Sequence, residues 1–165
     1  MDHTRGIIQI HSAPAALRPH LEWAVGAVFA HPVEFSWSDQ PAELRSLRAE
    51  YSWHGPAGTG AQLTSALRGC LRARFEVTEE AGAAGAGSRW AYTPALGLFA
   101  ATIGEHGDIM IHEDRLKQAL LADALGRRSL AEGVADLLGA RWDDELEVFR
   151  QAGAGQPVRW LHQVG

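Results

Sequence analysis

Apolar and polar side chains alternate in four short stretches within the first 80 residues, and a period of two predicts strands. The stretches are residues 5–11, 33–38, 48–53 and 74–78. From the second stretch onward, one parity carries large apolar side chains that we expect to face the core: Phe35, Trp37, Tyr51, Trp53, Phe75 and Val77. The other parity is charged, and we expect it to face solvent or lie beneath C-terminal helices: Glu34, Arg48, Glu50, Arg74 and Glu76.

Apolar residues at helical spacing separate these strands in two places. The first predicted helix covers residues 17–28, and Ser12 is its expected N-cap. The second covers residues 59–71 and is expected to begin with a capping box formed by Thr59 and Gln62.

The resulting order is strand, helix, strand, strand, helix, strand. This is the order of the split βαβ arrangement, β-α-β-β-α-β, found in ferredoxin-like folds. We therefore predict an α+β protein with a ferredoxin-like core over residues 1–80, and an α+β sheet of another topology is the alternative. The length fits one domain, residues 1–165.

The rest of the chain extends this core. A run of Ala and Gly at residues 81–87 predicts a turn, and residues 89–111 then predict an antiparallel meander. Residues 112–165 are predicted to be mainly helical, with a final short strand at residues 158–161. The expected helices there cover residues 113–126, a segment opened by a capping box at Ser129 and Glu132, and residues 143–149.

Composition excludes several classes of function. The net charge is −5 and the arginines are dispersed, which disfavours nucleic acid because its binding depends on a basic patch. Cys70 is the only cysteine, so neither an intrachain disulfide nor a cysteine zinc site is expected. The eight His residues lack close metal-ligand spacing, and we predict no metal and no cofactor. We expect a cytoplasmic protein, because no apolar stretch suits a signal peptide or a membrane span.

One loop could bind an anion. Residues 54–60 are rich in glycine and precede the second predicted helix, whose first amides are free to bind a phosphate or carboxylate. The anion would rest on Gly58, Thr59 and Gly60, with His54 beside it as a weak candidate for an acid or base. A plain tight turn before a helix explains the same residues without any ligand.

Charged residues suggest two places where a protein could dock. Arg68, Arg72 and Arg74 form a local basic group near the end of the second predicted helix. Asp143 and Asp144 open a later helix, where their favourable interaction with the helix dipole is an alternative explanation. No residues form a convergent catalytic group in the sequence.

Short motifs spread over nearly the whole chain resemble an actinobacterial family of uncharacterised proteins, a domain of unknown function. The motifs lie at residues 11–17, 19–23, 49–53, 74–80, 92–94, 107–109, 113–116, 142–147 and 157–163. The Ala and Gly run is the part least similar to the family. The resemblance implies a cytoplasmic bacterial protein and brings no activity, cofactor or catalytic residue. It also implies a link to type II fatty-acid synthesis, and hence to acyl carrier protein or acyl thioesters.

Two functions follow from these observations. The first is a non-catalytic accessory protein that binds a protein or an acyl-type ligand. The alternative is a small enzyme that acts on an anionic metabolite at the loop of residues 54–60.

Overall fold

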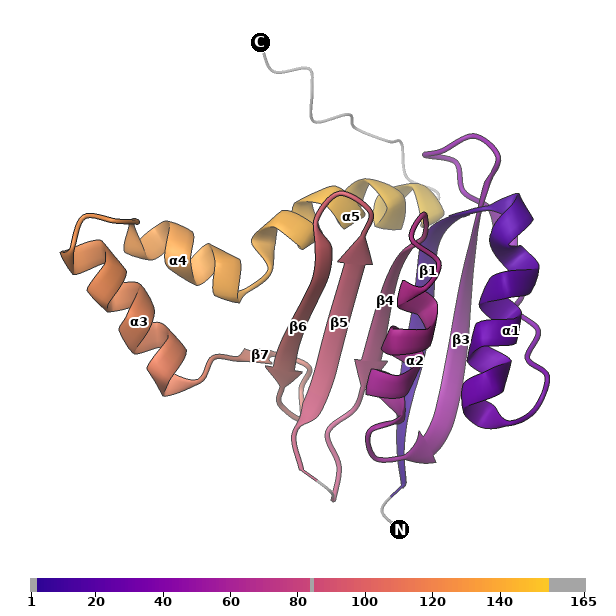
Figure 1. Cartoon of the computed structure of the whole chain (residues 1–165), viewed down its shortest axis with the longest axis horizontal. Coiled ribbons are helices and arrows are strands. Elements are labelled where there is room, and N and C mark those ends of the chain that lie inside the picture. The colour runs from indigo at the N-terminus through magenta and orange to yellow at the C-terminus, as the bar shows by residue number, and fades with distance from the viewer. Residues whose placement is uncertain (1–2, 84, 155–165) are drawn as a thin grey trace.

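Within the residues that the structure describes, the chain forms a seven-stranded antiparallel sheet and five α-helices (Figure 1). This computed structural model describes residues 3–83 and 85–154. The strands are β1 (His3–Pro14), β2 (Ser38–Asp39), β3 (Ser46–Pro56), β4 (Arg74–Glu79), β5 (Gly87–Thr93), β6 (Gly97–Ile103) and β7 (Ile109–Met110). The helices are α1 (Arg18–Phe29), α2 (Thr59–Arg68), α3 (Glu113–Ala124), α4 (Leu130–Leu137) and α5 (Ala140–Gly153), with a 3-10 turn, η1 (Ala15–Leu17), before α1. The strand order is β2-β3-β1-β4-β5-β6-β7, so the chain combines helices with an antiparallel sheet.

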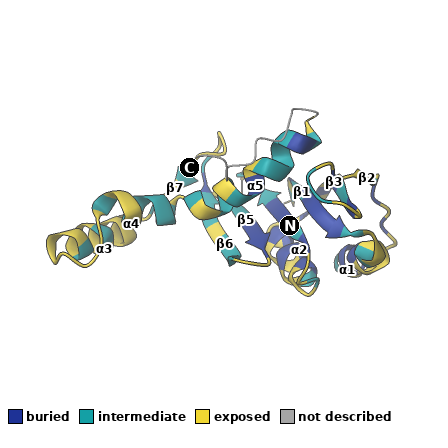
Figure 2. Ribbon diagram, turned by 90° about the horizontal axis from the view of Figure 1, so that it is seen from above, coloured by how far each residue is buried: buried dark blue, intermediate teal, exposed yellow. Residues whose placement is uncertain are grey.

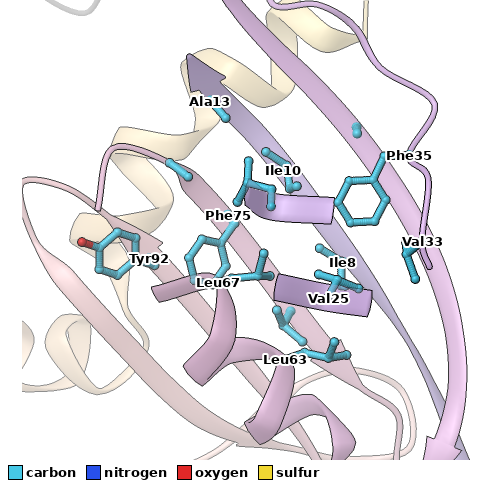
Figure 3. Packing of buried hydrophobic residues seen from close by; sticks show 14 of the residues in the cluster. Ile8, Ile10, Ala13, Val25, Val33, Phe35, Leu63, Leu67, Phe75 and Tyr92 are labelled. Carbon is cyan, nitrogen blue, oxygen red and sulfur yellow. The ribbon is translucent and has the colours of Figure 1, made fainter. Parts of the chain in front are cut away.

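The main hydrophobic core lies between the sheet and helices α1 and α2 (Figure 3). Leu21 and Val25 of α1, and Leu63 and Leu67 of α2, are completely buried, because residues four apart share one face of a helix. Each such side chain stabilises the fold by about 1.5–3 kcal/mol through burial. The helices cover Phe35, from the segment before β2, and these strand residues: Ile8, Ile10, Trp53, Phe75 and Val77. The predicted inward parity is confirmed, although Trp37 and Tyr51 are only partly buried.

The segment at residues 33–37 is extended but is not a strand, so that prediction was wrong. Val33 and Phe35 bury their side chains as the alternation predicts. However, the amide of Phe35 and the indole N–H of Trp37 donate to Glu22 of α1, at 3.0 and 2.7 Å. Pairing with β3 begins only at β2. The alternation of apolar and polar residues at 33–37 thus predicted correctly which side chains are buried, but it did not predict a strand. The Glu22 carboxylate accepts the hydrogen bonds here that a neighbouring strand would otherwise accept.

Both helix N-caps predicted in this half of the chain were wrong. Ser12 is completely buried within β1, beside a bulge near the end of that strand, and α1 starts only after η1. The N-cap of α2 is Gly58, with φ at +91°, and Thr59 is already helical. The Thr59 hydroxyl donates to the carbonyl oxygen of Pro56 at 2.7 Å and therefore does not cap the helix.

The meander predicted at residues 89–111 is confirmed, because β5, β6 and β7 pair in chain order beside β4. The Ala and Gly run connects β4 to β5. The strand predicted at residues 158–161 lies outside the described residues.

Helix α5 lies across one end of the second face of the sheet, on the side opposite α1 and α2 (Figures 1 and 2). Leu146 is completely buried there. The indole N–H of Trp142 donates to the carbonyl oxygen of Gly97 at 2.9 Å, and its ring packs on Phe99. The expectation that C-terminal helices cover the charged face is thus confirmed for α5. This helix is longer than the predicted residues 143–149.

Helices α3 and α4 form a hairpin, here called the arm (residues 113–138), that projects beyond the sheet (Figures 1 and 2). The predicted capping box at Ser129 and Glu132 is confirmed as the start of α4. Neither helix of the arm has a buried residue. Among the residues that the structure describes, no helix combines the length and apolar character that a membrane span requires.

Candidate functional site

The loop at residues 54–60, predicted to bind an anion, already contacts a carboxylate of the chain itself. Glu79, the last residue of β4, accepts hydrogen bonds from the amides of Gly58 and Gly60, at 2.8 and 2.7 Å. The positive end of the α2 dipole is therefore met by an internal anion. His54 is exposed beside this loop. An external anion would have to displace Glu79 before it could use these two amides.

Replacing Glu79 with Gln is expected to lower the free energy of unfolding by about 1–2 kcal/mol, because two amides at the start of α2 lose an ionised acceptor. Urea unfolding measures this change. Glu80→Gln is the matched control, because its carboxylate pairs with the exposed side chain of Arg5 and should contribute less than about 1 kcal/mol. Equal losses in the two variants would show that Glu79 does not hold the helix start.

A group of charged side chains, here called the Glu76 network, lies between β1, β4, β5 and α5. Its members are His11, Glu76, Arg89, Asp143 and Arg150. Glu76 is only 4% exposed and accepts from His11 at 2.7 Å and from both arginines at 2.7 Å. Asp143 accepts from the same two guanidinium groups, at 2.8 and 3.0 Å. The network therefore joins α5 to the sheet through charge pairs centred on the buried carboxylate of Glu76.

Electrostatics keep the centre of this network ionised. Burial by itself raises the pKa of Glu76, but hydrogen bonds and charge from His11 and Arg150 hold that pKa far below its ordinary value. Burial likewise opposes the charge on Arg89 and Arg150, yet Glu76 and Asp143 raise the pKa of both guanidinium groups. Every charge in the buried part is matched, which is what a structural cluster requires.

Arg74, predicted to dock a partner, instead lies inside a second charge cluster under α5. It donates to Glu43 at 3.1 Å, to Glu145 at 3.3 Å and to the hydroxyl of Ser12 at 3.1 Å. Its guanidinium also lies 4.5 Å from the centre of the Phe149 ring. These contacts hold α5 in place and leave Arg74 less accessible to another protein than the sequence suggests.

The other residues predicted to act in docking or chemistry are dispersed. Asp143 belongs to the Glu76 network, whereas Asp144 is exposed on α5. Burial raises the pKa of the Cys70 thiol, which suppresses the thiolate that a nucleophile needs. Arg68 and Arg72 are exposed at and just after the end of α2. Of the residues predicted to dock a protein, Arg68, Arg72 and Asp144 are therefore exposed to a partner.

A pocket of about 590 Å³ places Arg72 beside residues that the sequence analysis did not single out. Leu44 and Arg45, from the turn before β3, line the same pocket, here called the arginine pocket. Leu44 is 94% exposed. Within residues 3–83 and 85–154, neither Arg45 nor Arg72 has an ion-pair partner. The pocket thus combines two cations that have no ion-pair partner in the described chain with an uncovered apolar side chain, beside the Arg74–Glu43 ion pair, which also lines it.

The turn that presents Leu44 and Arg45 is held in a costly conformation. Arg45 has φ at +62°, a left-handed geometry that costs a non-glycine residue about 1–2 kcal/mol. Hydrogen bonds on both sides maintain it: the Ala15 amide donates to the Arg45 carbonyl oxygen at 3.2 Å, and the Ser46 hydroxyl donates to Glu43 at 2.6 Å. Strain of this kind collects at functional sites. The turn therefore projects these two side chains in a fixed geometry.

The comparisons with known proteins show the family of this chain. The chain matches the family described as Protein of unknown function (DUF3145) over residues 7–163, and it belongs to that family. No curated protein and no solved structure matches it. In the part of the chain that the structure describes, no three His, Cys, Asp or Glu side chains are grouped as metal ligands.

Proposed function

We propose that this protein is a non-catalytic docking protein that binds an acidic protein partner at the arginine pocket. One observation carries the proposal: Arg45 and Arg72 line one pocket without a carboxylate partner in the described chain, although the net charge is −5. Leu44 adds an uncovered apolar contact at the same place. Arginine next to apolar surface is typical of the residues that dominate protein interfaces.

The partner class that suits this pocket is a strongly acidic protein, and acyl carrier protein is the first candidate. Its negative surface would be complementary to Arg45 and Arg72, with Arg68 four residues before Arg72 as a further cation. The family resemblance in the sequence independently suggests a link to fatty-acid metabolism. The proposal accordingly places the protein in the cytoplasm of an actinobacterium.

The proposal includes the finer description of the fold as a ferredoxin-like core. The order β2-β3-β1-β4, with α1 and α2 packed together on one face, supports it. In that arrangement the arginine pocket lies where β1 ends and β3 begins, whereas the loop at residues 54–60 lies at the opposite end of both strands. The alternative function, an enzyme that acts on an anionic metabolite at that loop, stays a prediction. It requires the Glu79 carboxylate to give up its hydrogen bonds with the amides of Gly58 and Gly60.

We expect Arg45→Glu and Arg72→Glu each to weaken binding of purified acyl carrier protein at least about tenfold, because each converts an attraction into a repulsion. Isothermal calorimetry at low ionic strength measures the dissociation constant. Raising the salt to about 1 M should also weaken binding, because exposed charges are then screened beyond a few ångströms.

Arg141→Glu is the charge-matched control. Arg141 is exposed near the start of α5 and does not line the arginine pocket, and its variant has the same net charge as the other two. Unchanged affinity for this control supports the pocket. Equal weakening in all three variants, or no binding by the unaltered protein at millimolar concentrations, would overturn the proposal.

A further inference from the structure

A pocket of about 210 Å³ lies where β5, β6 and β7 meet the arm, and it is here called the edge pocket. The sheet contributes the neighbouring side chains of Ser88 on β5 and Thr102 on β6, which are paired across the two strands. The arm contributes Arg115 from α3 and Leu137 from α4. Among the described residues, the edge pocket and the arginine pocket share no lining residue, so they are separate places on the molecule.

One part of the edge pocket is apolar and has room for a ligand. Trp90 of β5 is paired with Ala100 of β6, and Met110 of β7 is paired with Thr102. All four residues line the pocket. Ala100 is exposed and carries only a methyl group, which leaves space beside the indole ring of Trp90. Small-ligand sites typically have such apolar walls, with a few polar groups that fix the orientation of the ligand.

The charged part of the edge pocket is positive. Arg115 lines it and has no ion-pair partner among the described residues. Glu113 and Asp114 precede Arg115 on α3, yet neither lines the pocket, and Glu113 is paired with Lys117. The guanidinium of Arg115 is therefore available to a carboxylate or phosphate, which arginine binds through two parallel hydrogen bonds.

Hydroxyl and imidazole groups add hydrogen-bonding capacity beside Arg115. Nε2 of His112 lies 3.4 Å from the hydroxyl oxygen of Thr102, and both residues line the pocket. Ser88 lines it too, next to Thr102 in the sheet. These groups come from two strands and from the residue before α3, so different parts of the chain bring them to one space.

The edge of β6 supplies a backbone donor. Within the described chain, β7 pairs with β6 only at Thr102 and Ile103. The Gly104 amide donates to Asp108 on that side at 2.9 Å, and residues two apart along a strand direct their backbone groups to the same side. The N–H of Ala100 therefore points to the side where β7 no longer pairs with β6. Backbone groups at an unpaired edge are ready to bind an added partner.

We propose that the edge pocket binds a small organic anion, in which a carboxylate or phosphate group is attached to a short apolar body. The anionic group would pair with Arg115 and accept from the Thr102 hydroxyl and the Ala100 amide, while the apolar body would lie on the ring of Trp90. The pocket is smaller than drug-sized sites of roughly 300–1,000 Å³, which limits the ligand to a small one. The proposal does not depend on docking of an acidic protein at the arginine pocket.

Titration of the isotope-labelled full chain with benzoate and with phenyl phosphate tests the site and distinguishes the two anionic groups. We expect at least one of them to shift the signals of Trp90, Ala100, Thr102 and Arg115, with a dissociation constant on the order of 1 mM, because so small a ligand makes few contacts. Benzamide has nearly the shape of benzoate without its charge. It should bind at least about tenfold more weakly, because Arg115 then has no anion to pair with.

Two variants separate the charged part of the pocket from its apolar part. Arg115→Gln should weaken binding of the preferred anion at least about fivefold, because the attraction of the guanidinium is lost. Ala100→Leu should weaken it at least about tenfold, because the larger side chain occupies the space beside Trp90. Lys117→Gln is the matched control, since Lys117 is an exposed cation on α3 that does not line the pocket, and it should leave the affinity unchanged.

An unchanged amide spectrum away from the edge pocket shows that each variant is folded. Shifts that neither anion produces at about 50 mM, far above the expected dissociation constant, would overturn the proposal. So would equal affinity for benzamide, equal weakening by Arg115→Gln and Lys117→Gln, or shifts centred on Arg45 and Arg72. The Arg45→Glu variant, which should lose the docking of acyl carrier protein, should keep its affinity for the anion, so the two proposals can fail separately.

Discussion

Replacing Glu76 with Gln is expected to lower the free energy of unfolding by about 3–5 kcal/mol at pH 7, because Arg89 and Arg150 then lose the buried one of the two carboxylates that they share, and only Asp143 remains. Glu76 accepts from His11 and from both arginines, so no other single carboxylate in the network holds as many partners. Urea unfolding measures the change. The loss should appear as detachment of α5, visible in the fluorescence of Trp142, which packs on β6.

Acid should reduce the difference in the free energy of unfolding between the unaltered protein and the Glu76→Gln variant. The pKa of Glu76 is held far below its ordinary value in the folded protein, so its stabilisation is fully present above the unfolded pKa of about 4.3 and is lost as the pH falls below it. Glutamine does not titrate, so the gap between the proteins should shrink from pH 7 to pH 3. The control is Glu50→Gln on the exposed part of β3, which should change stability by less than about 1 kcal/mol. A Glu76 effect no larger than this control, or one that grows in acid, would contradict the structural role of the network.

Gly6→Ala is expected to cost at least about 3 kcal/mol, because overpacking inside a well-packed core cannot be relieved when the obstacle is backbone. Gly6 lies in β1, between β3 and β4. A side chain there would overlap the carbonyl oxygen of Thr78 and the indole ring of Trp53. The strand would have to move away from β4, which breaks the pairing in the middle of the sheet.

Gly82→Ala is the matched control for this substitution. A side chain at Gly82 meets open space, and its φ is not positive, so the change should be neutral or stabilise by about 0.4–1 kcal/mol. Thermal and urea unfolding of the two variants give the comparison. Similar stability of Gly6→Ala and the unaltered protein would show that β1 is not fixed between its neighbours as described.

The sequence was sufficient to predict those features of the fold that depend only on the local spacing of apolar residues. Leu63 and Leu67 of α2, and Phe75 and Val77 of β4, show their buried face in the spacing of apolar residues, and all four are completely buried. The meander follows from the same alternation together with its turns. These features depend on local sequence, so they needed no knowledge of distant contacts.

Long-range pairing explains what the sequence could not show. The Thr59 capping box matched its motif, but Glu79, 20 residues later, supplies the acceptor that the helix start uses. From the sequence, Glu76 is expected to be an exposed strand residue. In the structure α5 covers it, and this could not be predicted because its partner Arg150 is 74 residues away. Arg45 carries no motif at all. A single Leu44 within a polar turn was the only local sign of the pocket.

Chemical-shift mapping tests the central claim, the docking of an acidic protein at the arginine pocket, most directly. Isotope-labelled protein would be titrated with unlabelled acyl carrier protein at low salt. The proposal predicts that the largest shifts cluster at Leu44, Arg45 and Arg72 and disappear in Arg45→Glu. Shifts centred on residues 54–60, or none at saturating concentrations of the partner, would contradict it.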